Sequence, residues 1–448
     1  MIELGLQRMS TLLKHTQLPF KAFHVAGTNG KGSICAYLSA MLRAGGLTCG
    51  TFTSPYLIDR WDCINIDGHP VDRGNFETTE KQIQQRAHDC HVQPTEFELL
   101  TATAFEIFRR QQVEVAVIEV GLGGRLDATN ALRQKAATII SKIGLDHQAF
   151  LGNTLEEIAY EKAGILLPGV PCIVDSTNPQ SVLDVVQKRA NELGVSITLA
   201  DSRSDNFATK YNHDFPNRMQ PHQLQNLACA YEALRQVYPN GLDLQVPKAK
   251  TQQNADIQKP LGQGFGLRHA GEEDKEYQML SSAIHGVSWP GRLQQLSIKP
   301  IFGREADVLL DGAHNAQSAQ VLSWFVNEKL RSDHQPVTWV LAASAGKDLG
   351  EILRILLREG DSIAAVEFGP VDGMPWVKPM DSSMVLKIAS ESGAMLSQQH
   401  SAGRDITSAL SWATQTSHEG PLVIAGSLYL VSDVLRILKE NPTHQNSS

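Results

Sequence analysis

The sequence predicts an α/β protein with two domains, each built around a mainly parallel sheet. Three observations support this fold class. Apolar runs of strand length alternate with helical patterns along most of the chain, as in parallel sheets covered by helices. The chain has 448 residues, more than a single hydrophobic core usually supports. Near the N-terminus an apolar run leads through a glycine-rich loop into a helix, in the segment FHVAGTNGKGS at residues 23–33.

Four runs in the first part of the chain have the composition of buried parallel strands: residues 23–26, 113–120, 137–143 and 171–174. Helices are expected between them. Examples are residues 34–43, which end at a Gly45-Gly46 pair, and residues 98–110, which follow Thr95.

Between residues 202 and 278 the composition changes to polar residues, glycine and proline. One helix is expected there, at residues 223–237. The polar stretch around residues 240–278 is interpreted as a surface insertion or mobile loop.

A second α/β series follows Trp289-Pro290-Gly291. Its expected strands are residues 307–310, 337–343, 363–368 and 422–425, and its expected helices are residues 316–330, 350–358, 382–391 and 428–440. The sequence therefore predicts a domain of residues 1–290 and a domain of residues 291–448, with a hinge near residues 286–297.

Composition excludes several classes of protein. No apolar run approaches the roughly 18 residues of a transmembrane helix. The formal net charge of −8, without clustered Lys and Arg, argues against nucleic acid as a partner. Six scattered cysteines without a C-x-x-C pair suit a reducing compartment and give no zinc pattern. The N-terminus lacks a signal-peptide pattern, so we expect a cytoplasmic protein, with a mitochondrial pool as an alternative.

The glycine-rich segment has the features of a phosphate-binding loop. Glycines let backbone N–H groups approach phosphate oxygens, the helix N-terminus carries a positive dipole end, and Lys31 adds a cation. The Ser33 hydroxyl can reach Mg²⁺. Gly32 separates Lys31 from Ser33, which departs from the strict G-x-x-x-x-G-K-[ST] pattern, so a glycine-rich turn without a ligand is the alternative.

Further candidates follow the predicted strands, because open parallel sheets bind ligands at the carboxyl ends of their strands. Glu119 ends VAVIEV and can hold Mg²⁺ directly or through water, or can form a structural ion pair with Arg125. His147, in KIGLDH, is either a metal ligand or an ordinary loop residue. Lys162, in YEKAGI, is by its local sequence a solvated surface lysine.

In the second series, Asp311 and His314 belong to DGAHN. Asp311 can accept from ribose hydroxyls and His314 can donate to a phosphate, or Asp311 is simply the N-cap of the following helix. Arg292, at the predicted hinge, can clamp a γ-phosphate once the domains close. Asn226 is by itself an ordinary helix-face residue.

Together these segments resemble the folylpolyglutamate synthase and dihydrofolate synthase family of Mur-type ligases. The motifs that carry the resemblance are GTNGKGS, TSP at residues 53–55, TEFELLTATAF, IEVGLGGRLDATN, LDH, LGNT, EKAGI, HQLQN, WPGRL, LLDGAHN and AGSLYL, in that order over nearly the whole chain. TEFELLTATAF, GLDH and DGMPW at residues 372–376 are similar to the fungal dihydrofolate synthetase branch.

The resemblance implies a P-loop-containing, Mur-ligase-like N-terminal domain with a mainly parallel sheet, and a smaller Rossmann-like C-terminal domain. It implies catalytic roles for Lys31, Lys162, His147 and Arg292, with Lys162 carbamylated. Implied contacts to ATP are Gly27, Thr28, Asn29, Gly30, Lys31, Gly32, Ser33, Asn226 (adenine), Arg292 (γ-phosphate), Asp311 and His314. Implied positions for one or two Mg²⁺ ions are Ser33, Ser54, Glu119 and His147, with a monovalent cation such as K⁺ as a further option.

The implied reaction joins L-glutamate to dihydropteroate. ATP phosphorylates the benzoate carboxylate, and the amine of glutamate attacks the acyl phosphate. Alternatives are a folylpolyglutamate synthase or bifunctional enzyme acting on reduced folates, and a non-catalytic nucleotide-binding regulator. We expect a monomer that acts away from membranes. The chain reads TSPY and WDCI where many family members read TSPH and ERI, which favours the dihydropteroate substrate.

Overall fold

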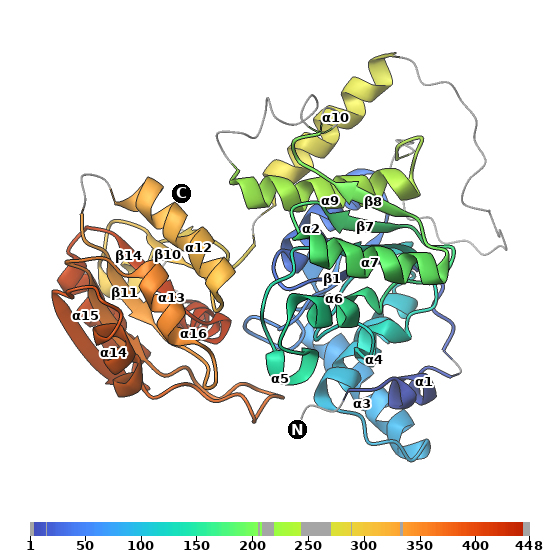
Figure 1. Ribbon diagram of the computed structural model, residues 1–448. Helices are drawn as coiled ribbons and strands as arrows, with labels where there is room; N and C mark the ends of the chain where they lie inside the picture. The colour runs from blue at the N-terminus through green and yellow to red at the C-terminus, as the bar shows by residue number, and fades with distance from the viewer. Residues whose placement is uncertain are drawn as a thin grey trace.

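A computed structural model describes residues 4–14, 16–204, 207, 219–242, 270–287, 289–331 and 335–441. In this part of the chain the strands form two separate sheets. Figure 1 shows the sheets side by side, each with helices on both faces. None of the described helices is long and apolar enough to cross a membrane.

The first sheet has the strand order β4-β3-β2-β5-β1-β6-β7-β8. Strands β2, β5, β1, β6, β7 and β8 are parallel, and the edge strands β3 and β4 are antiparallel. In that order the strands are His69–Pro70, Ile64–Ile66, Cys49–Phe52, Val115–Glu119, Lys21–Ala26, Lys135–Ile140, Cys172–Asp175 and Ile197–Ala200.

Helices cover both faces of this sheet because alternate residues of each strand point to opposite sides. In β1, Phe23 and Val25 join one core with helices α2, α9 and α10, whereas Ala22 joins another core with α1, α3 and α4. Helices α6 and α7 cover the β6–β7 end. The helices are α1 (Gln7–Leu12), α2 (Lys31–Ala44), α3 (Arg73–Asp89), α4 (Glu96–Arg110), α5 (Gln148–Leu151), α6 (Leu155–Ala163), α7 (Gln180–Leu193), α9 (Pro221–Val237) and α10 (Ala270–His285), with a 3-10 turn at Ala128–Ala131.

The second sheet has the order β13-β12-β11-β14-β10-β9, and only β9 at its edge is antiparallel among the described strands. In that order the strands are Gln398–Gly403, Ser362–Val366, Thr338–Leu341, Leu422–Ala425, Val308–Leu310 and Gln294–Leu296. The helices are α11 (Lys299–Phe302), α12 (Ala316–Phe325, continued by a π-helical turn, Val326–Leu330), α13 (Leu349–Leu356), α14 (Ser382–Ser390), α15 (Ile406–Ser417) and α16 (Leu428–Glu440). Helices α12, α13 and α14 cover one face, and α15 and α16 cover the other.

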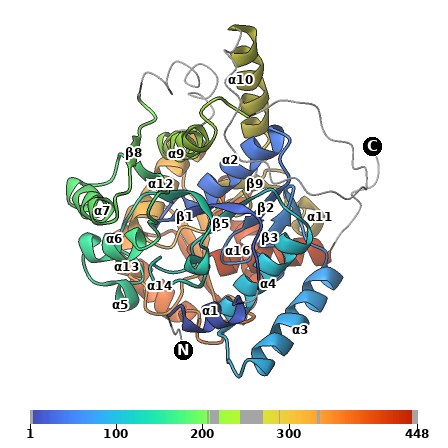
Figure 2. The ribbon, with the colours of Figure 1, turned by 90° about the vertical axis from the view of Figure 1, so that its right-hand side faces the viewer.

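The two-sheet α/β fold is confirmed, and each expected strand and helix overlaps an observed one. For the polar stretch around residues 240–278, the alternative of a mobile loop is wrong at the C-terminal end. Residues 243–269 lie outside the described part, but residues 270–278 belong to α10 (Figure 2). The sequence did not indicate this helix, because its first half reads GEEDKEYQ and is polar. The buried residues Leu280 and Ile284 lie in the last two turns of the helix.

Candidate active site

The glycine-rich loop joins β1 to α2 without a side-chain cap. Gly30 is the N-cap residue of α2, with a left-handed φ of 88°, and no side chain bonds the N–H groups of the first turn. A Cβ on Gly30 would lie 2.2 Å from Oδ1 of Asn226, so only glycine fits here. The backbone N–H groups of Thr28 and Asn29 donate to the carbonyl of Lys142 on the neighbouring β6 loop. The loop is therefore held by protein contacts, while the helix N-terminus stays available to an anion.

Glu119 ends β5 next to this loop. Its carboxylate lies 3.6 Å from Nζ of Lys31 and accepts from the backbone N–H of Ser54 at 3.3 Å. Burial raises the pKa of Glu119 above its usual value, and the charges of Lys31 and Arg292 oppose that shift. The expected alternative, an ion pair with Arg125, is wrong, because Arg125 pairs with Glu161 at 2.8 Å.

Lys162 is buried, which corrects its interpretation as a surface lysine. Its Nζ donates to the carbonyl of Gly27 at 2.8 Å, and among the described residues it makes no ion pair. Burial, and then the charge of Lys31, lowers the pKa of Lys162 to about 7. A substantial fraction of Lys162 is therefore the neutral amine near neutral pH.

His147 caps the short helix α5 with a left-handed φ of 52°, and its side chain is about half exposed. The neighbouring Asp146 was not predicted. Its carboxylate contacts Nζ of Lys347 and lies 3.4 Å from Nε2 of His314, and these two residues lie in the segments that follow strands β11 and β10 of the second sheet. Although burial opposes it, hydrogen bonding from His314 and the nearby positive charges hold the pKa of Asp146 well below its usual range.

The second sheet contributes Asp311, His314 and Arg292. Asp311 accepts from the backbone N–H groups of Leu293 and Ala313, both at 2.8 Å, so it braces the turn and does not cap the next helix. The N-cap of α12 is Asn315, which corrects the alternative role of Asp311. Nδ1 of His314 donates to the carbonyl of Gly312 at 2.8 Å, which fixes the ring.

A cavity of about 800 Å³, the phosphate-loop cavity, lies between the sheets at the carboxyl ends of their strands. Asn226 lines it, so this residue is more than part of a helix face. The structure brings every predicted site residue to this cavity: Gly27, Thr28, Asn29, Gly30, Lys31, Gly32, Ser33, Ser54, Glu119, His147, Lys162, Asn226, Arg292, Asp311 and His314.

A second cavity of about 530 Å³, the apolar cavity, adjoins the first. The two share Ser54, Pro55, Gly121, His147, His314 and Leu428. Most of the lining is apolar or aromatic, and Lys347 and Lys378 are the cations on its C-terminal-domain side. The aromatic and large apolar residues are Leu4, Tyr56, Phe97, Leu100, Leu122, Leu126, Met374, Trp376, Val377, Leu428 and Tyr429.

The donor set near the loop fits a Mg²⁺ ion carried by a phosphate ligand. The described residues contain no cluster of three His, Cys, Asp or Glu side chains that would hold a metal alone. Glu119 provides one buried carboxylate, and Ser33 and Ser54 provide hydroxyls at the same cavity. Mg²⁺ commonly binds through one or two carboxylates together with waters and substrate phosphates, which matches this set.

Two family models match the chain. Residues 25–219 match the Mur ligase middle domain, and residues 294–437 match the dihydrofolate synthetase C-terminal domain. Two curated relatives are the probable dihydrofolate synthetase of Schizosaccharomyces pombe and the dihydrofolate synthetase of Saccharomyces cerevisiae. The first is 38% identical and the alignment covers 98% of this chain and 99% of the relative; the second is 35% identical, with 97% and 98% covered.

A solved structure shares the fold over nearly the whole chain. It is a bifunctional folylpolyglutamate synthase/dihydrofolate synthase with Mn, AMPPNP and L-glutamate bound, 27% identical, with a TM-score of 0.72 and coverage of 98% of this chain and 95% of that one. The motif order, the paired sheets and the full-length identity agree, and the chain belongs to the dihydrofolate synthetase and folylpolyglutamate synthase family of Mur-type ligases.

Proposed function

We propose that the protein is a dihydrofolate synthetase, which uses ATP to join L-glutamate to dihydropteroate and releases ADP and phosphate. The observation that carries this proposal is the pair of adjoining cavities between the sheets, one at the glycine loop and one apolar. A triphosphate fits the first, and a flat pterin with a benzoyl ring fits the second. At their shared rim, a carboxylate of the acceptor would lie next to the phosphates.

Lys31, Arg292 and the uncapped N-terminus of α2 would bind the triphosphate and stabilise charge during phosphoryl transfer. Asn226, which lies against Gly30, would contact the adenine, and Asp311 and His314 would contact the ribose and phosphate. Ser33, Ser54, Glu119 and His147 would hold Mg²⁺, which neutralises phosphate charge when bound.

The acceptor carboxylate would attack the γ-phosphorus to give an acyl phosphate and ADP. The amine of glutamate would then attack the acyl carbon and release phosphate. Lys347 and Lys378 are suited to the carboxylates of glutamate, since both line the apolar cavity from the second sheet. Closure of this sheet over the cleft would keep water from the acyl phosphate.

Lys162 would react with carbon dioxide to form a carbamate. Its neutral amine is available near neutral pH, and the product replaces a cation beside the metal site with oxygens that Mg²⁺ prefers. We expect Lys162→Ala to lose activity that bicarbonate or small carboxylates restore in part, and Lys162→Arg to stay inactive. The direct measurement is the carbamate mass increment in metal-bound protein. An unmodified Lys162 that Arg replaces without loss would refute this part alone.

The deciding experiment measures phosphate release that depends on both ATP and glutamate, with either dihydropteroate or tetrahydrofolate as acceptor. We expect turnover with dihydropteroate and little with tetrahydrofolate. Preference for tetrahydrofolate would instead identify a folylpolyglutamate synthase. Release that needs no glutamate, or none with either acceptor, would overturn the ligase assignment.

A further inference from the structure

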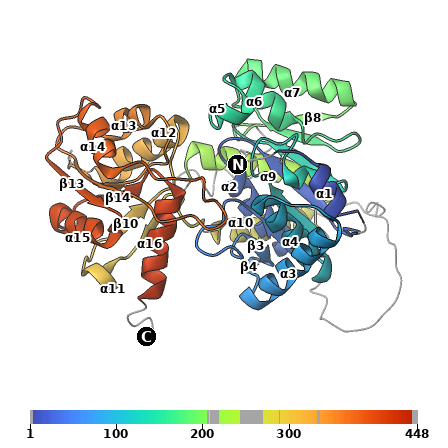
Figure 3. The ribbon, with the colours of Figure 1, turned by 90° about the horizontal axis from the view of Figure 1, so that it is seen from below.

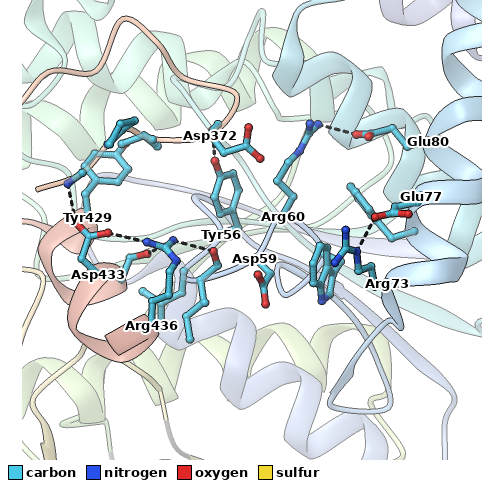
Figure 4. A pocket seen from close by; sticks show the side chains of 18 residues that line it. Tyr56, Asp59, Arg60, Arg73, Glu77, Glu80, Asp372, Tyr429, Asp433 and Arg436 are labelled. Carbon is cyan, nitrogen blue, oxygen red and sulfur yellow. Dashed lines mark hydrogen bonds and ion pairs between the residues drawn. The ribbon is translucent and has the colours of Figure 1, made fainter. Parts of the chain in front are cut away.

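A third cavity, of about 490 Å³, adjoins the apolar cavity. It lies between the loop after Pro55, helix α3 and helix α16. Its lining is charged and aromatic, and we call it the charged cavity (Figure 4). The labelled side chains that line it are Tyr56, Asp59, Arg60, Arg73, Glu77, Glu80, Asp372, Tyr429, Asp433 and Arg436.

A wall of two cross-links separates the charged cavity from the apolar cavity. In one, the hydroxyl of Tyr56 donates to the backbone carbonyl of Asp372 on the second sheet's loop. In the other, Arg60 pairs with Glu96 at 3.3 Å and with Glu80 at 2.6 Å. Both cavities share Tyr56, Arg60, Asp372 and Tyr429, which places these residues at the boundary.

The wall is braced from both sides. On the first sheet's side, Asp62 accepts from three successive backbone N–H groups, those of residues 57–59, at 2.7–3.0 Å. On the other side, Arg436 of α16 donates to the carbonyl of Ile58 at 3.1 Å. Asp433, also on α16, accepts from the N–H of Gly369 at 2.7 Å. The two loops that form the wall therefore hold defined positions.

The wall unites two stretches that the family resemblance alone left without a role. TSPY with WDCI belongs to the first sheet's loop, and DGMPW belongs to the loop that leaves β12. They are 316 residues apart in sequence at the Tyr56–Asp372 contact. Figure 3 shows the loop after β12 extending from the second sheet towards the first.

We propose that this wall sets the length of the acceptor, so that the enzyme adds one glutamate and rejects its own product. This inference rests on the proposed function. The product also ends in a carboxylate and is therefore a potential next acceptor. It is longer than dihydropteroate by a glutamyl residue, at least about 3.5 Å of extended chain. With its terminal carboxylate at the phosphate loop, its pterin has to pass the wall and enter the charged cavity.

Burial, and then the carboxylate of Asp372, raise the pKa of Tyr56, so its hydroxyl keeps the proton that it donates. The arginines of the charged cavity are not free to bind a longer acceptor, because each already has a carboxylate partner. Arg73 pairs with Glu77 at 2.6 Å, and Arg436 pairs with Asp433 at 2.7 Å. A pterin that displaced Tyr56 would lose the cross-link and would meet arginines that already have partners.

The test measures the ratio of kcat/KM for dihydropteroate to kcat/KM for its monoglutamyl product, in the wild-type protein and in Tyr56→Ala. We expect the ratio to fall about tenfold or more, as for other discriminations by size, and diglutamate products to be visible by mass spectrometry. Tyr56→Phe keeps the ring and loses only the cross-link, so its ratio should fall less. The matched control is Arg73→Ala, which lines only the charged cavity and should leave the ratio unchanged.

An unchanged ratio in Tyr56→Ala, with turnover of dihydropteroate retained, would overturn the proposal. If that variant does not fold, Arg60→Ala opens the second cross-link and is judged by the same ratio. A wild-type enzyme that does not use dihydropteroate would refute the proposed function. A wild-type enzyme that uses it, with variants of unchanged ratio, would refute the wall alone.

Discussion

The loop after β1 and the loop after β10 have the same plan, a parallel strand that ends in a turn and a helix, yet their helices begin differently. Helix α2 begins at Gly30 and has no side-chain cap. Helix α12 begins at Asn315, whose side chain accepts from the N–H of Ser318 at 2.9 Å in a capping box. A strand-to-helix turn is thus open to an anion when the chain provides no cap of its own.

Charge follows the same division. Lys31 and Lys162 lie close to the first loop. Among the described residues, Nζ of Lys31 is 3.6 Å from the carboxylate of Glu119, and Lys162 makes no ion pair. In the second loop, the oxygens of Asp311 already accept from two backbone N–H groups. The first turn is therefore prepared for a ligand, and the second mainly positions its own residues.

The largest effect is expected for Lys31→Ala. It should lower kcat by about 10²–10³, because a preorganised charge next to the transferred phosphoryl group is lost. Turnover and thermal unfolding should be measured on the same preparation. The control is Lys299→Ala, whose partner Glu305 lies on the surface. Near-normal turnover in Lys31→Ala would remove the distinction between the two loops.

Arg292 tests whether the second sheet reaches the first loop. Its charge acts on both Glu119 and Asp311, one from each sheet. We expect Arg292→Lys to lose about tenfold or more in kcat/KM for ATP, because a point charge does not reproduce a bidentate fork. Full activity of the Lys variant would mean that Arg292 does not contact the nucleotide.

A pH effect on stability is expected from His24 in β1. Burial, and then the charge of Lys135, lower the pKa of His24 well below its usual value. The unfolded chain then binds more protons than the folded one below about pH 6.5, so stability falls as the pH drops, by at most about 1.4 kcal/mol per pH unit. Urea unfolding at pH 7.5 and 5.5 should show a smaller difference in His24→Gln than in the wild type. Equal differences would show that His24 does not contribute.

The smallest effect is expected for Asn315→Ala. Loss of the cap on α12 should lower the free energy of unfolding by about 1 kcal/mol, measured with urea. Asn315→Asp keeps an acceptor at this position and serves as the control. A loss as large in the Asp variant would show that the cap is not what stabilises the turn.

The sequence predicted the buried parts of the fold and the strand-end residues because both depend on local patterns. The runs in β1, β5, β6 and β14 are mostly apolar, so their burial could be predicted. Strand β13 reads QQHSAG, and as a polar edge strand it gave no such signal. Asp146 was missed because its partner Lys347 is 201 residues away. Lys347 itself follows β11, so the strand-end rule would have found it. The assigned roles and the boundary between residues 290 and 291 stay predictions.

The contacts that cross the cleft also have a thermodynamic consequence. Nδ2 of Asn29, in the first loop, donates to Oε1 of Gln317 on α12 at 2.7 Å, and Asp146 contacts Lys347. A ligand that binds the residues of one sheet and favours these contacts also favours the position in which the residues of the other sheet bind their ligand. By linkage, nucleotide and amino acid should then raise each other's affinity by the same factor, so each titrates more tightly in the presence of the other.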